Sequence, residues 1–223
     1  MELGDLLRFT HCGNTVFTSA DEAGLRCPVC GQAVRFALSE APVRIQCPIR
    51  DGHRASCCFL VTSQSGAIGL SEEKESELHV GICNSEGLVF SYTELGVQCQ
   101  QQGWEQSIII PLVAPSNCIP DFKRRWDAQL EVFAALDTWT PDRFQEEREF
   151  GSCCYGFALG FINQVMMSQG KQPISRECFT SEYVLPRIES ATRYLSVFQH
   201  VCRHGYHCTG QRSDWNSHVS WGP

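Results

Sequence analysis

The sequence lacks an uninterrupted apolar run of about eighteen residues, the length that a membrane-spanning helix requires. Its first ten residues include acidic side chains and no long apolar core, so we expect neither a signal peptide nor a membrane span. A basic surplus is lacking too, because 25 Asp and Glu outnumber 18 Lys and Arg and give a formal charge of −7. Proteins that hold nucleic acid through its phosphates need a basic face, so nucleic-acid binding is not expected.

Cysteine, in contrast, is abundant, with 14 in 223 residues. Without a signal peptide we expect the protein in the cytoplasm, the nucleus or both, where cysteines stay reduced. Reduced thiols in such number serve as metal ligands or as nucleophiles. The sequence contains patterns typical of each use.

The distribution of apolar residues divides the chain into a β-rich module and a larger domain. Residues 1–62 alternate short β-type runs with turns, and residues 63–77 form a polar stretch with Gly and Ser that favours a linker or loop. Residues 78–208 combine strands with helices, whereas residues 209–223 lack periodicity and are expected to be a disordered tail. We therefore predict an α+β protein in which the helices of the second domain pack on an antiparallel sheet.

Periodicity also predicts individual elements. Strands are expected, from period-two alternation, at 6–9, 33–38, 43–47, 57–62, 78–83, 88–92 and 107–112. Helices are expected, from apolar residues three and four apart, at 122–133, 154–165 and 188–202.

A metal site is predicted in the first module. Cys27-Pro28-Val29-Cys30-Gly31 has the spacing with which two thiolates of one tight turn bind a single metal ion. A second turn around Cys12 resembles half of such a motif, which makes the module similar to a zinc ribbon with Cys12, Cys27 and Cys30 as ligands. The expected cofactor is one structural zinc ion, and the alternative is a zinc-free fold whose cysteines are small buried apolar residues.

Four-coordinate zinc needs one more ligand. The spacing leaves this ligand open among four residues: His11, Cys47, His53 and Cys57. We include Cys57 in the predicted set.

A thiol and an imidazole form the second candidate site. Ser152 is a good N-cap residue, which would place Cys154 in the first turn of a helix, where unpaired amides favour the thiolate. His79 lies in a predicted strand and could act as its base. The alternative is structural, with Cys154 a buried core residue and His79 a hydrogen-bonded one.

The order of these two residues resembles that of circularly permuted papain-like folds, such as the lecithin:retinol acyltransferase and deSUMOylating isopeptidase groups. The resemblance implies that Cys154 is the nucleophile and His79 the base, with Ser91 as the nearest match to a third residue that orients the imidazole. The substrate would be an acyl compound, with an ester, thioester or isopeptide bond. The alternative function is an inactive remnant of this fold that binds a partner protein as a scaffold.

A wider resemblance covers about residues 6–206, which are similar to the makorin-2 opposite-strand protein family. The segments that carry it are 11–13, 27–31, 78–82, 103–107, 154–159 and 183–187. This resemblance implies the two-part architecture and no particular activity.

A group of histidines lies near the end of the last predicted helix. His200 and His204 are four residues apart and share a helix face, which permits a metal ligand pair, and His207 follows. Because no acidic third ligand is in register, we interpret the group as an exposed helix end.

Overall fold

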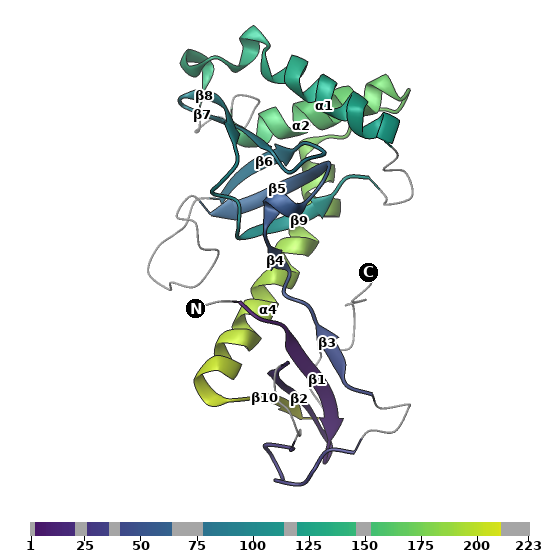
Figure 1. The fold of residues 1–223 in the computed structure, drawn as a ribbon, viewed down its shortest axis with the longest axis vertical. Coiled ribbons are helices and arrows are strands. Elements are labelled where there is room, and N and C mark those ends of the chain that lie inside the picture. The colour runs from purple at the N-terminus through teal and green to yellow at the C-terminus, as the bar shows by residue number, and fades with distance from the viewer. Residues whose placement is uncertain are drawn as a thin grey trace. The chain divides into compact units, whose positions relative to one another are not determined.

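The computed structural model describes residues 3–20, 26–35, 41–63, 78–113, 120–145 and 153–210. The chain forms two compact units. Unit 1 combines the ends of the chain, Met1–Cys47 and Thr192–Pro223, and unit 2 is Pro48–Ala191. Each unit has its own antiparallel sheet, which confirms the α+β class (Figure 1).

The sheet of unit 1 has the strand order β10-β2-β1-β3. Its strands are β1 (Leu6–His11), β2 (Asn14–Ser19), β3 (Val43–Ile45) and β10 (His207–Gly210). The hairpin between β1 and β2 turns through Cys12 and Gly13, whose φ angles of 43° and 76° are both positive. Two positive φ angles in a two-residue loop are typical of the type I′ turn, whose twist matches that of the flanking strands.

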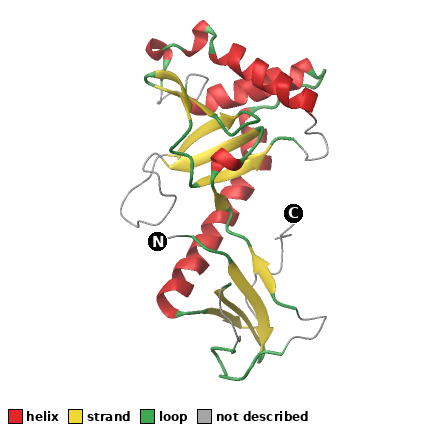
Figure 2. Cartoon of the chain, viewed as in Figure 1, coloured by secondary structure: helices red, strands yellow, loops and turns green. Residues whose placement is uncertain are grey.

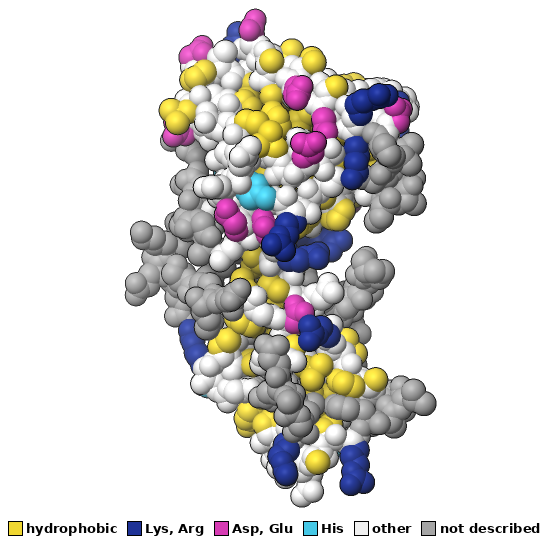
Figure 3. Space-filling model, in the orientation of Figure 1, with side chains coloured by type: hydrophobic (Ala, Val, Ile, Leu, Met, Phe, Trp, Pro, Cys, Tyr) yellow, Lys and Arg dark blue, Asp and Glu magenta, His cyan; other side chains and the backbone are white. Residues whose placement is uncertain are grey.

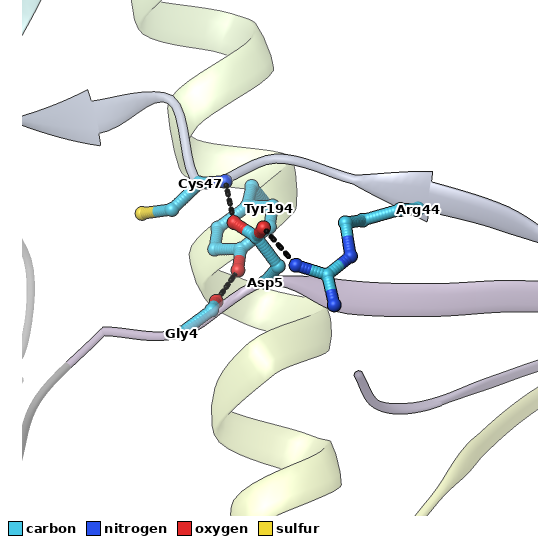
Figure 4. Close-up of polar contacts among 5 residues, drawn as sticks. All are labelled: Gly4, Asp5, Arg44, Cys47 and Tyr194. Atoms are coloured by element: carbon cyan, nitrogen blue, oxygen red, sulfur yellow. Dashed lines mark hydrogen bonds and ion pairs between the residues drawn. The ribbon is translucent and has the colours of Figure 1, made fainter. Parts of the chain in front are cut away.

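Helix α4 (Leu185–His204) contributes its second half to unit 1. Figure 4 shows the Tyr194 side chain of α4 reaching the chain before β1, where its hydroxyl donates to the carbonyl of Gly4. Beside it, Asp5 accepts a hydrogen bond from the amide of Cys47 at 3.0 Å and pairs with Arg44 at 3.3 Å. These contacts join segments that are far apart in the sequence into one unit.

Unit 2 contains a six-stranded antiparallel sheet of order β4-β9-β5-β6-β7-β8. Its strands are β4 (Ile49–Arg50), β5 (Cys58–Ser63), β6 (Leu78–Cys83), β7 (Val89–Thr93), β8 (Gly96–Gln100) and β9 (Ser107–Pro111). The predicted module boundary at residue 62 therefore falls inside a strand of this sheet.

The helical elements complete the two units. They are α1 (Pro120–Ala134), α2 (Cys154–Ser168), α3 (Arg176–Phe179), the π-helical η6 (Thr180–Val184) and α4, together with the 3₁₀ turns η2 (Gly52–Arg54), η4 (Asp137–Trp139) and η5 (Pro141–Arg143). In unit 2, α1 and α2 run alongside each other (Figure 2). They pack through an edge-to-face contact of Trp126 with Phe161, whose ring centroids are 4.9 Å apart.

The two faces of the unit 2 sheet carry different contacts. Phe59 of β5 pairs with Ile82 of β6, and because paired residues share a face, both point to the same side. On that side the ring of Phe59 packs against that of Tyr155 of α2, with ring centroids 5.7 Å apart. The ring of Tyr92 of β7 likewise lies near that of Phe157 of α2, with centroids 6.4 Å apart. This side is therefore the face covered by α2.

A second core occupies the opposite face of the same sheet. It contains Cys58, Leu60, Cys83, Val89 and Trp104, all buried. Trp104 follows β8 and is 1% exposed, so its indole closes this face.

The three predicted helices and most of the predicted strands are present, with corrections. Strands β2, β4, β8 and β10 were not predicted, and Thr209 and Gly210, which we placed in a disordered tail, belong to β10. Most of the predicted linker (64–77) and the tail beyond 210 lie outside the described residues. Among the described helices, none has both the length and the apolarity to cross a membrane.

Candidate metal centre

Four potential metal ligands meet at one end of the unit 1 sheet. His11, Cys12, Cys27 and Cys30 each offer a ligand atom, and these four atoms lie within 4.8 Å of one another. The Sγ atoms of Cys12 and Cys27 are 3.8 Å apart, and Cys30 Sγ is 3.3 Å from Nδ1 of His11. Four such donors are enough to complete the coordination of a single ion.

Two tight turns bring these residues together. His11 ends β1 and Cys12 occupies the type I′ turn. Cys27 and Cys30 belong to a second turn, closed by hydrogen bonds of 2.8 Å from Gly31 N to Cys27 O and from Cys27 N to Gln32 O. Gly31 has φ of 74°, which a residue with a side chain rarely adopts.

The distances fit tetrahedral coordination. With Zn–S bonds of about 2.3 Å and Zn–N bonds of about 2.1 Å, two bound sulfurs lie about 3.8 Å apart and a sulfur–nitrogen pair about 3.6 Å apart. The observed separations of 3.8 Å and 3.3 Å are close to these values. Cys12, Cys27 and Cys30 are not in disulfides, so each can ionise to the thiolate, which is the form that ligates metals.

The electrostatics of the turn favour a thiolate. Burial alone would raise the pKa of the Cys27 thiol, but backbone hydrogen bonds at Cys30 and Val29 and contacts with the thiols of Cys30 and Cys12 outweigh it and lower this pKa to about 7. A lowered pKa makes the thiolate of Cys27, the form that binds metals, easier to reach.

Three of the predicted ligands lie in this cluster, and the fourth is a correction. The donor that completes the set is His11, one of the four residues left open by the sequence. Cys57, which we had included, is not among the clustered donors and belongs to unit 2, where its amide donates to Asn84 at 3.1 Å. Cys47 and His53 are not in the cluster either.

The predicted base, His79, lies on the face of the unit 2 sheet that carries the second core. Its ring packs against the indole of Trp104, with ring centroids 5.5 Å apart and planes inclined by 36°. Burial lowers the pKa of this imidazole below its ordinary value, and the charge of Glu94 acts in the opposite sense.

The predicted nucleophile, Cys154, is the first residue of α2, which covers the other face of that sheet. The N-cap is Cys153, not Ser152 as expected, and Ser152 itself lies outside the described residues. Because side chains alternate along a strand, His79 and the face that meets α2 point in opposite directions. The structure therefore does not bring Cys154 and His79 together.

Ser91 is buried on the same face as His79, but its hydrogen-bond partner is Gln100 and not the imidazole. Its hydroxyl donates to Oε1 of Gln100 at 3.2 Å, and the same oxygen accepts from Nε1 of Trp104 at 2.9 Å. Ser91 and Trp104 thus share Gln100 as acceptor, and the indole in turn packs at an inclined angle against His79. Sequence reasoning missed Gln100, because a lone Gln in a strand gives no motif.

Unit 2 also has a cavity of about 650 Å³ between α1, α2 and the segment that follows α2. Its walls include Phe122, Trp126 and Ile162, with Arg125 and Lys171 among the polar residues. Of the described lining residues, none is a predicted catalytic residue. Basic side chains on the visible surface are scattered among acidic and apolar ones (Figure 3).

Comparison with known proteins gives two matches. The family model described as DUF4796 C-terminal matches residues 42–201. The human protein named MKRN2 opposite strand protein is 35% identical to this chain over 206 residues, which cover 92% of this chain and 89% of the relative. No solved structure matches the chain.

Proposed function

We propose that this chain, which belongs to the family of the MKRN2 opposite strand protein and contains the DUF4796 C-terminal domain, is a non-catalytic scaffold. In this proposal one zinc ion holds unit 1 together. The sequence resemblance to this family is confirmed, and it brings no activity with it. The proposed ligands are His11, Cys12, Cys27 and Cys30.

The zinc proposal is supported above all by the positions of the four ligand atoms, which all lie within 4.8 Å of one another. Three thiolates and one imidazole are a ligand set typical of structural zinc sites, which leave no coordination position open for substrate. A small unit also gains from such a site, since a small core supplies little stability and a bound metal adds to it.

The scaffold proposal is supported by the separation of Cys154 from His79. A thiol hydrolase or acyltransferase needs its base within hydrogen-bond reach of the nucleophile. With the imidazole on one face of a central strand and α2 on the other, the chemistry predicted from the papain-like resemblance has no assembled pair to perform it. Unit 2 then acts by binding a partner protein.

The zinc proposal is tested by elemental analysis of untagged protein dialysed against a weak chelator. We expect about one zinc ion per chain, because a complete Cys₃His set binds tightly. This zinc should be lost in Cys27→Ser and Cys30→Ser and depleted in His11→Gln.

Matched controls are Cys57→Ser and the exposed Cys178→Ser, which should keep the metal. Protein that retains no zinc, or Cys30→Ser that retains as much as the wild type, would contradict the metal proposal. Turnover of a model ester, thioester or isopeptide that disappears in Cys154→Ser would contradict the scaffold proposal.

A further inference from the structure

Unit 2 contains a hollow, here called the α1–α2 cavity, between α1, the end of α2 and the segment that follows α2. Its volume is about 650 Å³, and small-molecule sites have volumes of about 300–1,000 Å³. Its described lining residues all belong to unit 2, whereas the four candidate metal ligands belong to unit 1. What the cavity binds is therefore independent of the zinc proposal.

The wall formed by the segment after α2 is fixed by the backbone. Helix α2 ends at a turn in which Gly170 has φ of 72° and the amide of Lys171 donates to the carbonyl of Met166 at 3.0 Å, as in a Schellman motif. Further along, Asn163 of α2 holds Ile174 with two hydrogen bonds, donating to its carbonyl at 3.0 Å and accepting from its amide at 2.8 Å. The cavity is thus built before any ligand arrives.

Aromatic side chains give the cavity an apolar interior. Phe179 and Tyr183 line it with stacked rings, whose centroids are 5.3 Å apart and whose planes are inclined by 22°. Tyr183 lies in the π-helical η6, and π-helical turns are rare and frequent at functional sites. Trp126 donates its indole N–H to the carbonyl of Cys83 at 3.1 Å, so its polar atom is satisfied by the sheet and its ring adds apolar surface.

The charges at the cavity are of one sign. Of the lining residues that the structure describes, the charged ones are Arg125 and Lys171, and both are exposed, which places them at the rim. Arg125 has a long ion pair with Asp121, at 3.6 Å, and Lys171 makes no ion pair within the described part of the chain. Two cations at one opening contrast with the net charge of −7 of the whole chain.

We propose that the α1–α2 cavity binds a small amphiphile with an apolar body and one anionic head group, a carboxylate or a phosphate. The aromatic and aliphatic walls bury the body, which gains free energy in proportion to the apolar area removed from water. Arg125 and Lys171 bind the head group, Arg125 through the planar guanidinium that matches both anions and Lys171 as a point charge. This binding adds a ligand to the scaffold and involves no bond cleavage.

The test is calorimetric titration of the purified full chain with decanoate, decyl phosphate and decanol, which share one apolar chain and differ in the head group. We expect the two anions to bind more tightly than decanol, and a preference between them identifies the head group. Arg125→Gln and Lys171→Gln should each weaken anion binding at least about fivefold and leave decanol binding unchanged. The matched control is Arg187→Gln, which removes an exposed cation of α4 that does not line the cavity and should bind as the wild type does.

A second pair of variants locates the bound chain. Gln129 lines the cavity from α1, so Gln129→Trp should fill it and weaken all three ligands. Ala128→Trp places the same indole at the exposed neighbouring position, which does not line the cavity, and should bind as the wild type does. Circular dichroism checks that each variant is folded, and the variants of exposed Arg125 and Lys171 test the proposal even if Gln129→Trp does not fold.

Three results would overturn the proposal. The first is a wild-type chain that binds neither decanoate nor decyl phosphate. The second is anion binding that is unchanged in both Arg125→Gln and Lys171→Gln. The third is equal binding by folded Gln129→Trp and Ala128→Trp, which would place the ligand outside the cavity.

Discussion

His79 and Trp104 pack against each other with ring centroids 5.5 Å apart and planes inclined by 36°, on the face of the unit 2 sheet that is turned away from α2. The indole donates a hydrogen bond to Oε1 of Gln100, and Ser91 donates to the same oxygen. The histidine is thereby part of a packed aromatic pair, and its partner is a side chain that cannot accept a proton. This arrangement predicts the reactivity of Cys154, the stability of the protein in acid and the effect of a side chain at Gly81.

The alkylation rate of Cys154 should not depend on His79. A thiol activated by a base loses reactivity when that base is removed, whereas His79 points to the face of the sheet opposite the one that α2 and Cys154 cover. We expect labelling by iodoacetamide in His79→Ala to stay within about twofold of wild type, measured by mass spectrometry of the peptide that contains Cys154. The exposed Cys178 provides the internal reference in each sample. A large drop in the labelling rate of Cys154 alone would instead support Cys154 and His79 as a catalytic pair.

Stability should fall in mild acid because of His79. Its pKa is lowered by burial, so the folded state binds fewer protons than the unfolded state between the lowered pKa and the ordinary value of 6.5. The free energy of unfolding then rises with pH through this window and falls as pH decreases through it. Urea denaturation at about pH 7.5 and about pH 5.5 should show a smaller loss in His79→Gln than in wild type.

The exposed Gln101, whose side chain does not titrate, provides the control for this pH effect, because Gln101→Ala should lose as much stability in acid as the wild type does. An unchanged acid loss in His79→Gln would show that the imidazole is not buried as a neutral group.

Gly81 is required by the packing beside this pair. A Cβ at this position would lie 2.8 Å from Cη2 of Trp104, 2.8 Å from Cγ1 of Val89 and 3.0 Å from the carbonyl oxygen of Phe90. Overpacking of this kind costs about 1–3 kcal/mol, so Gly81→Ala should lower the free energy of unfolding by that amount. Gly4→Ala is the control, since its Cβ would meet nothing within 4 Å. Equal stability of the two variants would mean that the indole can move aside.

Tyr194 should stabilise unit 1 through its hydroxyl. The ring is buried, and the hydroxyl donates to the carbonyl of Gly4. Tyr194→Phe removes this bond and keeps the ring, with an expected loss of about 0.5–1.5 kcal/mol in thermal or urea denaturation. Tyr206→Phe, whose hydroxyl has no hydrogen bond within the described residues, should be neutral. A neutral Tyr194→Phe would show that water replaces the bond without cost.

The sequence was informative where local periodicity decides structure. The helices α1, α2 and α4 follow from apolar residues three and four apart, and β6 from strict alternation between Leu78 and Cys83. The short strand β10 could not be predicted, because it exists only through its pairing with β2 about 190 residues earlier in the chain. The unit boundary was missed for the same reason.

The candidate metal cluster was predicted in part for a similar reason. The spacing of Cys27 and Cys30 fixes a turn, which is local, whereas the choice among His11, Cys47, His53 and Cys57 depends on which segments fold together. The pairing of Cys154 with His79 came from the order of residues in a resemblance. Order along the chain does not determine which side of a sheet receives a helix.

The discontinuous make-up of unit 1 has a consequence for synthesis on the ribosome. Residues Met1–Cys47 emerge first, but β2 lacks its neighbour β10 and Gly4 lacks its bond to Tyr194 until the last part of the chain has been made. The nascent amino-terminal segment must therefore wait while the whole of Pro48–Ala191 is translated. During that interval His11, Cys12, Cys27 and Cys30 have all been made, so under the zinc proposal the metal centre is the part of unit 1 that could assemble before the carboxy-terminal segment arrives.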